Sequence, residues 1–325
     1  MRLAFIGASG HHYLRRAMPR DAVLAVVNDR HDRTAATRLA DTLGQPSTSF
    51  DDVASMLVEF KPDLISVGVV YAHASEVITD CLPAGVPIVS DKPIATTWSG
   101  YDKLVTTANQ PGAGPLLTEF DFRGRASFLA ARRVVQEGGI GQVALITAQK
   151  SYRWGTRPAW YADREHYGST LLWVASHAID ALRFVTGTEP VCRHAYQANV
   201  TRGVEWGTAE DVASATYSLP TGGVAMVHAD FLRPKASPTH ADDRFRIAGS
   251  KGLIEIRDNR CWLTTTDQPP TDITDSVPDI EFGKTILDAA MQGGTDDLCT
   301  SESLKSAKLL LETLDRADAE SAHFT

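Results

Sequence analysis

The chain has 325 residues, of which 43% are hydrophobic, so it can bury more core than a single domain usually holds. A formal net charge of -8 argues against nucleic acid or an anionic membrane as the main partner, because phosphate binding needs clustered cationic side chains. No apolar run approaches the ~18 residues of a membrane span, and the apolar run at the N-terminus is too short for a secretory signal. We therefore expect a cytoplasmic protein whose partners are neither nucleic acid nor membrane.

The cysteines do not indicate a metal centre. They are scattered through the chain, without a C-x-x-C pair and without ligand-like spacing to histidine. We interpret them as reduced, structural thiols and predict no metal site. The four are Cys81, Cys192, Cys261 and Cys299.

Short apolar strands alternate with helical segments up to Glu119. Buried, β-branched strands in this alternation are typical of a parallel doubly wound sheet. Gly44, just after the last periodic residue of a helix, indicates a C-terminal cap. The predicted strands are 2–7, 22–28, 63–70, 87–93 and 115–120, and the predicted helices are 13–18, 32–44, 51–61, 73–85 and 99–110.

The pattern changes after Glu119, where strands become dominant. We expect domain 1–120 to be followed by an α+β domain, 121–325, with a large, mostly antiparallel open sheet and helices on one face. Whether the final helix packs back on the first domain is left open. The predicted elements are a helix at 125–141, a strand at 142–154, an aromatic loop at 153–169, a helix carrying His177, hairpins turning at 221–223 and 250–252, and a helix at 302–318.

The stretch FIGASGHH stands at the first strand-to-helix turn, where a dinucleotide-binding fingerprint belongs. A tight turn there needs glycine, and the helix that follows would offer amide N–H groups to a pyrophosphate. G-x-G-x-x-G is matched only in part, and an ordinary turn is the alternative. The candidate cofactor-binding residues are Gly7 at the first position, Ser9 at the second, His12 at the third, and Ala8, Gly10 and His11 between them.

The second strand ends in VVNDR, where a ribose-binding acidic residue is expected ~20 residues after the first glycine. Asn28 and Asp29 lie 21 and 22 residues after Gly7. Arg30 could instead receive a 2′-phosphate, so the sequence leaves both NAD and NADP open. A solvated helix start is the alternative interpretation of Asp29 and Arg30.

Further stretches complete a pattern that runs in order along the chain. They are VGVV followed by HAS, SDKPIATT, FDFRGRASF, QEGGIGQV, SHAIDALRFVTG and IAGSKGLIEI. Together they resemble the Gfo/Idh/MocA family of nicotinamide-dependent oxidoreductases. The resemblance implies a Rossmann domain, a second domain whose open sheet often makes dimer or tetramer contacts, and a sugar, cyclitol or related polyol as substrate. It adds Gly68, Val69, His73, Asp91, Lys92 and Pro93 to the cofactor-binding residues.

The resemblance also implies the catalytic pair. The family's E-K-P lysine and D-x-G-x-H histidine flank the nicotinamide, and here they correspond to Lys92 and His177. Trp173 occupies the aspartate position and Ala175 the glycine position, so the dyad lacks the family's carboxylate; Asp180 could orient the ring instead. His177 suits proton transfer at neutral pH, and Lys92 can stabilise a developing alkoxide.

The loop before the His177 helix is rich in aromatic residues and arginine. Aromatic platforms and multidentate arginine donors suit a carbohydrate, and Trp173 could form one wall of its pocket. The alternative is a subunit interface, where the same residue types are enriched. The candidate substrate-binding residues are Arg123, Arg153, Trp154, Trp160, Tyr161, Trp173 and His177.

Other functions remain open at this level. Within enzymes, the cofactor could oxidise a sugar carbon transiently and so permit elimination of a glycosidic group. A non-catalytic ligand-sensing regulator on the same scaffold would explain the incomplete glycine fingerprint and the missing aspartate. Lys92 and His177 favour an enzyme, because a sensor has no need for a proton-transfer pair; otherwise His177 is a hydrogen-bonded core histidine.

Overall fold

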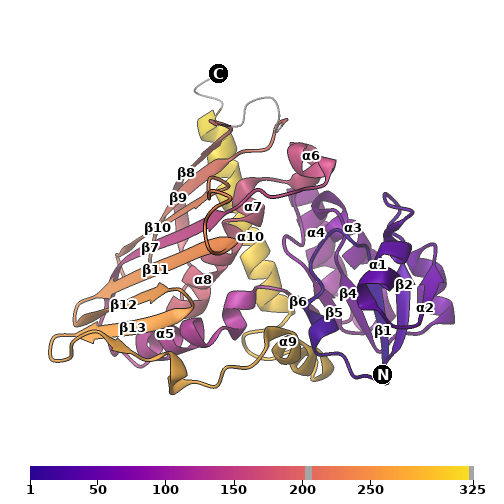
Figure 1. The fold of residues 1–325 in the computed structure, drawn as a ribbon, viewed down its shortest axis with the longest axis horizontal. Helices are drawn as coiled ribbons and strands as arrows, with labels where there is room; N and C mark the ends of the chain where they lie inside the picture. Colours follow the sequence, from indigo (N-terminus) through magenta and orange to yellow (C-terminus); the bar gives the residue numbers. More distant parts are fainter. Residues whose placement is uncertain (202–206, 322–325) are drawn as a thin grey trace. The chain divides into compact units, whose positions relative to one another are not determined.

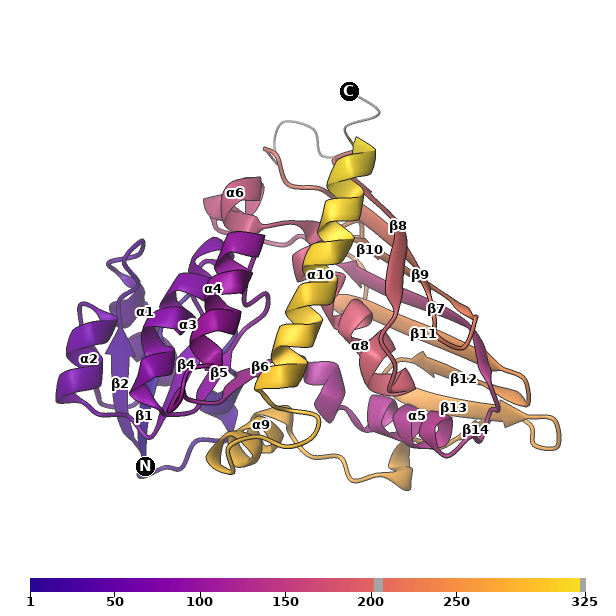
Figure 2. The same ribbon diagram turned by 180° about the vertical axis from the view of Figure 1, so that it is seen from behind.

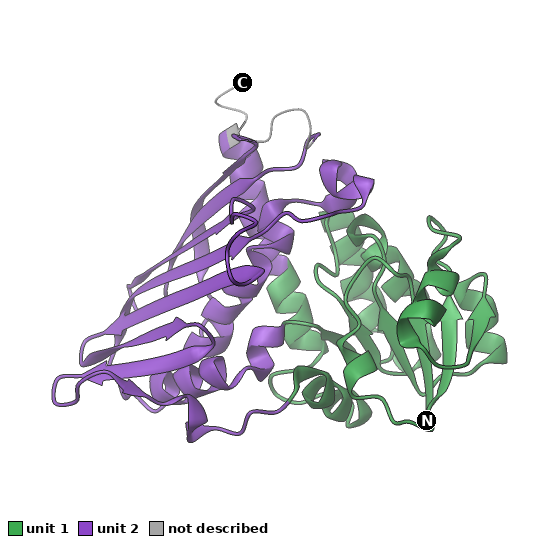
Figure 3. Cartoon of the chain, in the orientation of Figure 1, with its two compact units in different colours: residues 1–120, 281–307 green, residues 121–280, 308–325 purple. Residues whose placement is uncertain are grey.

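The structure is a computed structural model that describes residues 1–201 and 207–321 (Figure 1). The chain forms two compact units, shown in Figure 3. Unit 1 comprises Met1–Phe120 and Glu281–Ala307, and unit 2 comprises Asp121–Ile280 and Lys308–Thr325. Unit 1 is therefore discontinuous in sequence, because the whole strand-rich segment is inserted between its two parts.

Unit 1 contains a six-stranded sheet in which every neighbouring pair is parallel. The strand order 3-2-1-4-5-6 is that of a Rossmann fold, and it confirms the predicted doubly wound sheet. Crossovers leave in opposite directions from β1, so the carboxyl ends of β1 and β4 form the switch point at which such folds bind ligands. The strands are β1 (Arg2–Ile6), β2 (Val23–Val27), β3 (Ser47–Phe50), β4 (Leu64–Val67), β5 (Ile88–Ser90) and β6 (Leu116–Thr118).

Helices cover both faces of this sheet, because successive side chains of a strand point to opposite sides (Figures 1 and 2). Ala4 and Ile6 of β1 pack in one core with α2, α3 and α4. Leu3 and Phe5 pack in the other with α1 and α9. The helices are α1 (Ala35–Leu43), which is capped by Gly44 at φ 62° as predicted, α2 (Val53–Glu59), α3 (Ala74–Cys81), α4 (Trp98–Ala108) and α9 (Phe282–Met291).

The predicted helix over 13–18 is wrong. A single 3₁₀ turn, Tyr13–Arg16, stands in its place. Pro19 blocks helical continuation and β2 begins at Val23, so too few residues remain for two helical turns. The sheet face that a longer helix would cover is instead packed by α9, a helix that the sequence analysis did not predict.

Unit 2 contains an eight-stranded sheet that is antiparallel except for the parallel pair β7–β10, in agreement with the predicted fold class. The two predicted hairpins are present as β9–β10 and β11–β12. The strands are β7 (Val143–Tyr152), β8 (Val191–Ala198), β9 (Val212–Ser218), β10 (Val224–Asp230), β11 (Ala241–Gly249), β12 (Gly252–Arg257), β13 (Arg260–Thr265) and β14 (Thr271–Asp272).

Helices of unit 2 lie on one face of its sheet (Figures 1 and 2). The predicted helix that carries His177 is α8, which begins at Ser176, and a separate short helix, α7, ends at Trp173. Every residue of α8 up to Val185 is buried, so His177 sits on a rigid element. No helix in the described ranges is long and apolar enough to cross a membrane. The remaining helices are α5 (Ala126–Gln136), α6 (Arg164–Tyr167), α7 (Thr170–Trp173), α8 (Ser176–Thr186) and α10 (Thr300–Ser321), of which the part up to Ala307 belongs to unit 1.

Two residues of α2 test the packing of unit 1. Met56 is fully buried in the core, whereas Val58 on the same helix is 71% exposed. We expect Met56→Ala to lower the free energy of unfolding by about 2–5 kcal/mol, because it leaves a cavity. Val58→Ala should change it by less than about 0.5 kcal/mol. Urea denaturation followed by circular dichroism measures both, and equal effects would contradict this packing.

Candidate functional site

The glycine turn after β1 is packed against the end of β4. Gly7 has a φ of +75°, and a Cβ there would lie 2.5 Å from Cγ1 of Val69, so only glycine fits. The amides of Ser9 and Gly10 both donate to the carbonyl oxygen of Gly68, at 2.8 and 2.7 Å. The turn therefore holds the two strand ends of the switch point together, and two of its amides already have an acceptor.

His12 is a structural part of this turn. Its Nε2 lies 2.9 Å from the Gly7 carbonyl oxygen, and its Nδ1 lies 2.7 Å from Oγ of Ser66. Burial lowers the pKa of His12 to about 4, so the ring is neutral at physiological pH. Both ring nitrogens of His12 are therefore within hydrogen-bond distance of groups of the protein. His12 was predicted to bind the cofactor, but in the structure it stabilises the turn.

The segment after β5 carries Lys92 in a buried setting. Lys92 is 1% exposed and precedes Pro93 through a cis peptide bond. Asp91 accepts from the Lys92 amide at 2.9 Å through Oδ1 and from the His11 amide at 2.8 Å through Oδ2. Burial opposes ionisation of Asp91, but the charges of His11 and Lys92 lower its pKa overall. The lysine thus has an ionised carboxylate beside it.

A cavity of about 620 Å³ opens where β2 and β3 end. Asn28 is used structurally: its Oδ1 accepts from the Ala36 amide at 2.9 Å, and its Nδ2 donates to Asp51 at 3.3 Å. Asp29 is 1% exposed; its Oδ1 accepts from the His31 amide, whereas its buried Oδ2 has no hydrogen-bond partner in the described part of the chain. An unsatisfied carboxylate oxygen at this strand end fits the ribose hydroxyls of a dinucleotide.

Arg30 lines the same cavity but is paired with carboxylates. It forms ion pairs with Glu76 and, at 3.0 Å, with Asp80. A guanidinium held by two carboxylates is a poor receptor for a 2′-phosphate, which would have to displace them. Arg33, a second cation of the lining, donates to the Asp51 carbonyl oxygen. The residues of the cavity therefore fit a ribose without a phosphate better than one that carries it.

In unit 2, His177 does have a carboxylate partner. Its Nδ1 lies 3.0 Å from Oδ1 of Asp121, and both side chains are buried. Asp180, the expected candidate, instead holds the guanidinium of Arg123 at 2.8 and 2.7 Å. Arg123, predicted to bind substrate, is thereby engaged in a buried ion pair whose side chains are 3% and 0% exposed. The sequence analysis missed Asp121 because it lies far from His177 in the chain, although FDFRGR was noticed.

Asp121 is held ionised by several charges. Arg125 lies 2.5 Å from its Oδ2, and Asp243 joins Arg125 to Lys150 through ion pairs of 3.1 and 2.7 Å. Burial raises the pKa of Asp121, but His177, Arg125 and Lys150 together hold it well below its usual range. An ionised carboxylate can only accept, so the contact suits a proton on Nδ1 of His177, and in the neutral ring Nε2 is then the acceptor.

The aromatic candidates of the loop 153–169 gather into one cluster. Trp160 stacks on Tyr161 at 4.1 Å between ring centroids, and Trp154 meets Tyr161 edge-on at 6.2 Å. Trp173 is 2% exposed and packs against the same tyrosine at 6.2 Å. Arg153 is half-buried, with an Nε that has no hydrogen-bond partner in the described ranges. Trp173, predicted to form a pocket wall, is thus a buried member of an aromatic cluster.

Comparisons with known proteins place the chain in a family. Residues 1–114 match the family model described as oxidoreductase family, NAD-binding Rossmann fold, and residues 128–255 match the Gfo/Idh/MocA C-terminal domain. The chain belongs to the Gfo/Idh/MocA family. Both of its units therefore have counterparts there, and the predicted resemblance is confirmed.

Individual members of the family are similar at moderate identity. D-glucoside 3-dehydrogenase of Escherichia coli is 28% identical over 253 residues, which cover 71% of this chain and 70% of that protein. Inositol 2-dehydrogenase 2 of Saccharopolyspora erythraea is 26% identical over 175 residues, or 54% and 49% of the two chains. The structure of an oxidoreductase from Thermotoga maritima superposes with a TM-score of 0.89, at 26% identity and 98% coverage of both chains.

The ion pair of Arg123 with Asp180 allows a test of whether Arg123 stabilises the fold or binds the substrate. Arg123→Met leaves a buried carboxylate without its partner and should lower the free energy of unfolding by about 3–5 kcal/mol. The double variant Arg123→Met/Asp180→Leu should recover most of that loss, because no buried charge remains. Chemical denaturation measures both. The matched control is Arg193→Met on the exposed face of β8, expected within about 0.5 kcal/mol of wild type. A stable Arg123→Met protein would contradict the structural role.

Proposed function

We propose that this protein is an NAD-dependent dehydrogenase or reductase that moves a hydride between a sugar, cyclitol or related polyol and nicotinamide. The observation that carries the proposal is the buried pair of His177 and Asp121, which is suited to proton transfer. The family assignment supports the redox chemistry. The named activities of two relatives, on a glucoside and on inositol, support the substrate class.

His177 is the proposed base in the oxidative direction. A secondary alcohol loses a hydride from carbon and a proton from its hydroxyl group, and the bound nicotinamide supplies the hydride acceptor. Nε2 of His177 takes the hydroxyl proton, so the alcohol becomes a carbonyl group and the ring becomes imidazolium. Asp121, ionised and 3.0 Å from Nδ1, stabilises that cation. In the reductive direction, the imidazolium returns the proton.

Lys92 is the proposed electrophile. An ammonium group donates to the substrate oxygen and stabilises the negative charge that develops as the proton leaves. Asp91 compensates the lysine charge from within the buried segment, through the same carboxylate that fixes the His11 amide. Lys92 and His177 thus divide the work between charge stabilisation and proton transfer.

The cofactor is held by residues of unit 1 in this proposal. Asp29 accepts from the ribose hydroxyls, because its Oδ2 is buried and has no partner within the described residues. Gly7 allows the tight turn that packs the end of β1 against Val69 at the switch point, where a pyrophosphate would lie. Arg30, held by Glu76 and Asp80, favours NAD over NADP.

The substrate is held by residues of unit 2 in this proposal. Trp154 and Trp160, the partly exposed members of the aromatic cluster, offer their faces to the C–H side of a sugar ring. Arg153 adds a half-buried cationic donor for hydroxyl groups. Trp173, at the position where the family has its aspartate, packs on Tyr161 and supports this platform, while Asp121 supplies the carboxylate beside His177.

Cofactor choice can be tested without knowing the substrate. Calorimetric titration should show NADH binding at least about tenfold more tightly than NADPH, because a 2′-phosphate would face Asp29 and compete with Glu76 and Asp80 for Arg30. Asp29→Asn should weaken NADH binding by about tenfold or more through loss of a charged acceptor. Asp21→Asn, at an exposed acidic residue before β2, is the control and should leave the affinity unchanged. Equal affinity for both cofactors would contradict the role of Arg30.

The catalytic roles require a substrate, found by screening D-glucosides, inositols and related polyols with NAD+ at 340 nm. His177→Ala and Lys92→Met should each lower kcat by about 10²–10⁴-fold, because a proton-transfer or charge-stabilising group is lost. Asp121→Asn should lower kcat about 10²-fold or more and leave the Kd for NADH close to wild type. It should also lower the thermal midpoint of unfolding, because Arg125 loses a buried partner. His166→Ala, an exposed histidine of α6, is the control. A His177→Ala enzyme with wild-type kcat would overturn the assignment.

A further inference from the structure

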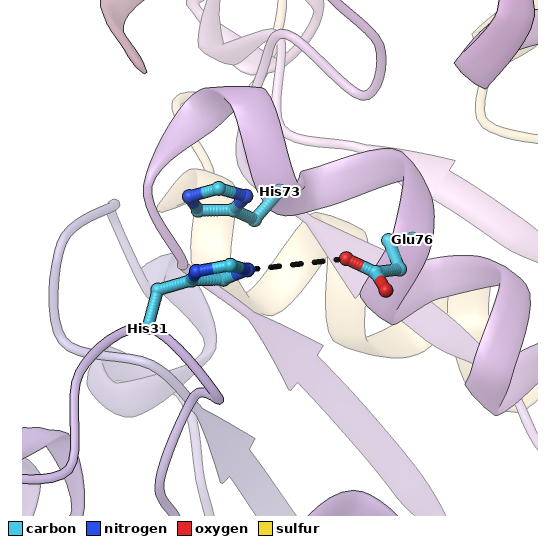
Figure 4. Close-up of side chains that lie close together, drawn as sticks. All are labelled: His31, His73 and Glu76. Carbon is cyan, nitrogen blue, oxygen red and sulfur yellow. Dashed lines mark ion pairs between the residues drawn. The ribbon is translucent and has the colours of Figure 1, made fainter.

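A second cluster of ionisable groups lies in unit 1, apart from Lys92 and its neighbours. His31 belongs to the loop after β2, His73 immediately precedes α3, and Glu76 lies in the first turn of α3 (Figure 4). One donor atom from each residue lies within 4.8 Å of the other two. His73 and Glu76 are three residues apart, so the helical turn brings them to the same side. Sequence analysis assigned His73 to the cofactor and predicted no metal.

The three side chains lie close enough together to share one ligand. The rings of His31 and His73 are stacked at 3.4 Å between centroids and 12° between planes, with the Glu76 carboxylate beside them (Figure 4). Nε2 of His31 lies 4.0 Å from Oε2 of Glu76. Arg30 pairs with the other oxygen, Oε1, so the ion pair leaves Oε2 directed toward the histidines. His31 and Glu76 are exposed, so an ion can reach them from solvent.

We propose that His31, His73 and Glu76 bind a divalent transition-metal ion of the Zn²⁺ type. Two imidazole nitrogens and one carboxylate oxygen are a donor set that suits Zn²⁺, Co²⁺ and Ni²⁺, whereas Mg²⁺ and Ca²⁺ prefer all-oxygen sites. Three protein ligands leave the fourth position of a tetrahedral ion for water. The proposal goes beyond the hydride-transfer function and does not depend on it.

Metal binding requires one local change. Zn²⁺ binds imidazole at about 2.0–2.1 Å along a lone pair in the ring plane. Two parallel, stacked rings direct their lone pairs side by side, so at least one ring must turn for both to meet one ion. His31 is exposed, and turning it breaks no core packing. Arg30, bound to Oε1 of Glu76, then orients the carboxylate from outside the metal's own ligands, as second partners do at metal sites.

The test is a calorimetric titration of the untagged protein, first stripped with chelator, with ZnCl₂. We expect one ion per chain. His31→Ala, His73→Ala and Glu76→Gln should each weaken binding by at least about tenfold, since even the partners of metal ligands contribute that much. The control is His194→Ala: His194 lies 3.3 Å from Glu320 but belongs to no three-ligand group in the part of the chain that the structure describes. This variant should bind Zn²⁺ as wild type does.

A spectroscopic readout distinguishes these ligands from a nonspecific site. Co²⁺ should give visible absorption bands of a low-coordinate histidine site in wild type and in His194→Ala, and these bands should be lost in His31→Ala. Thermal unfolding of each apo variant checks that it is folded. Absence of Zn²⁺ binding, unchanged affinity in the three ligand variants, or binding of Mg²⁺ with the same affinity as Zn²⁺ would each overturn the proposal.

Discussion

The burial of an ionised carboxylate at Asp121 is the constraint around which unit 2 is organised. A buried charge without a partner costs several kcal/mol of folding free energy, so Asp121 requires nearby cations. Those cations in turn require carboxylates. Arg125 compensates Asp121, Asp243 compensates Arg125, and Lys150 compensates Asp243. The chain of charges runs from the segment after β6 through the residue that precedes α5 to β11 and β7, and its other end is the imidazole of His177. The orientation of one histidine is thus fixed by the packing of four elements.

The parallel sheet and the hairpins, which follow from local sequence pattern, were predicted correctly. Alternating β-branched strands and helices indicated the parallel sheet, and glycines at 222 and 252 marked the hairpins of unit 2. The features that the sequence analysis did not predict depend on contacts between residues far apart in the chain. Asp121 reaches His177 only through the fold, and Asp180, the nearer choice in sequence, was already committed to Arg123. Helix α9 was missed because the surface it covers, around Leu3 and Phe5, lies at the other end of the chain.

The glycine fingerprint illustrates how a degraded motif can remain a sound structure. His12 stands where the fingerprint has its third glycine, which packs a helix closely against a strand, but only a 3₁₀ turn follows here. Its ring instead bonds to the Gly7 carbonyl oxygen and to Ser66, and the amides of Ser9 and Gly10 bond to Gly68. Backbone groups that a longer helix would have aligned are satisfied by side chains and by β4. The turn thus lacks the helix that the motif predicts, but its buried polar groups still have hydrogen-bond partners, as buried polar groups generally must.

The position of α9 has a consequence for biosynthesis. Its Phe282, Ile286 and Leu287 complete the core on one side of a sheet whose first strand starts at Arg2. During translation, the part of that face which α9 covers stays exposed while the whole of Asp121–Ile280 is made, although α1 can already pack on the rest. The N-terminal unit begins synthesis first yet finishes folding after the inserted unit has all its strands. Such a chain exposes a nascent apolar sheet face for most of its time on the ribosome, where it is open to chaperones and to aggregation.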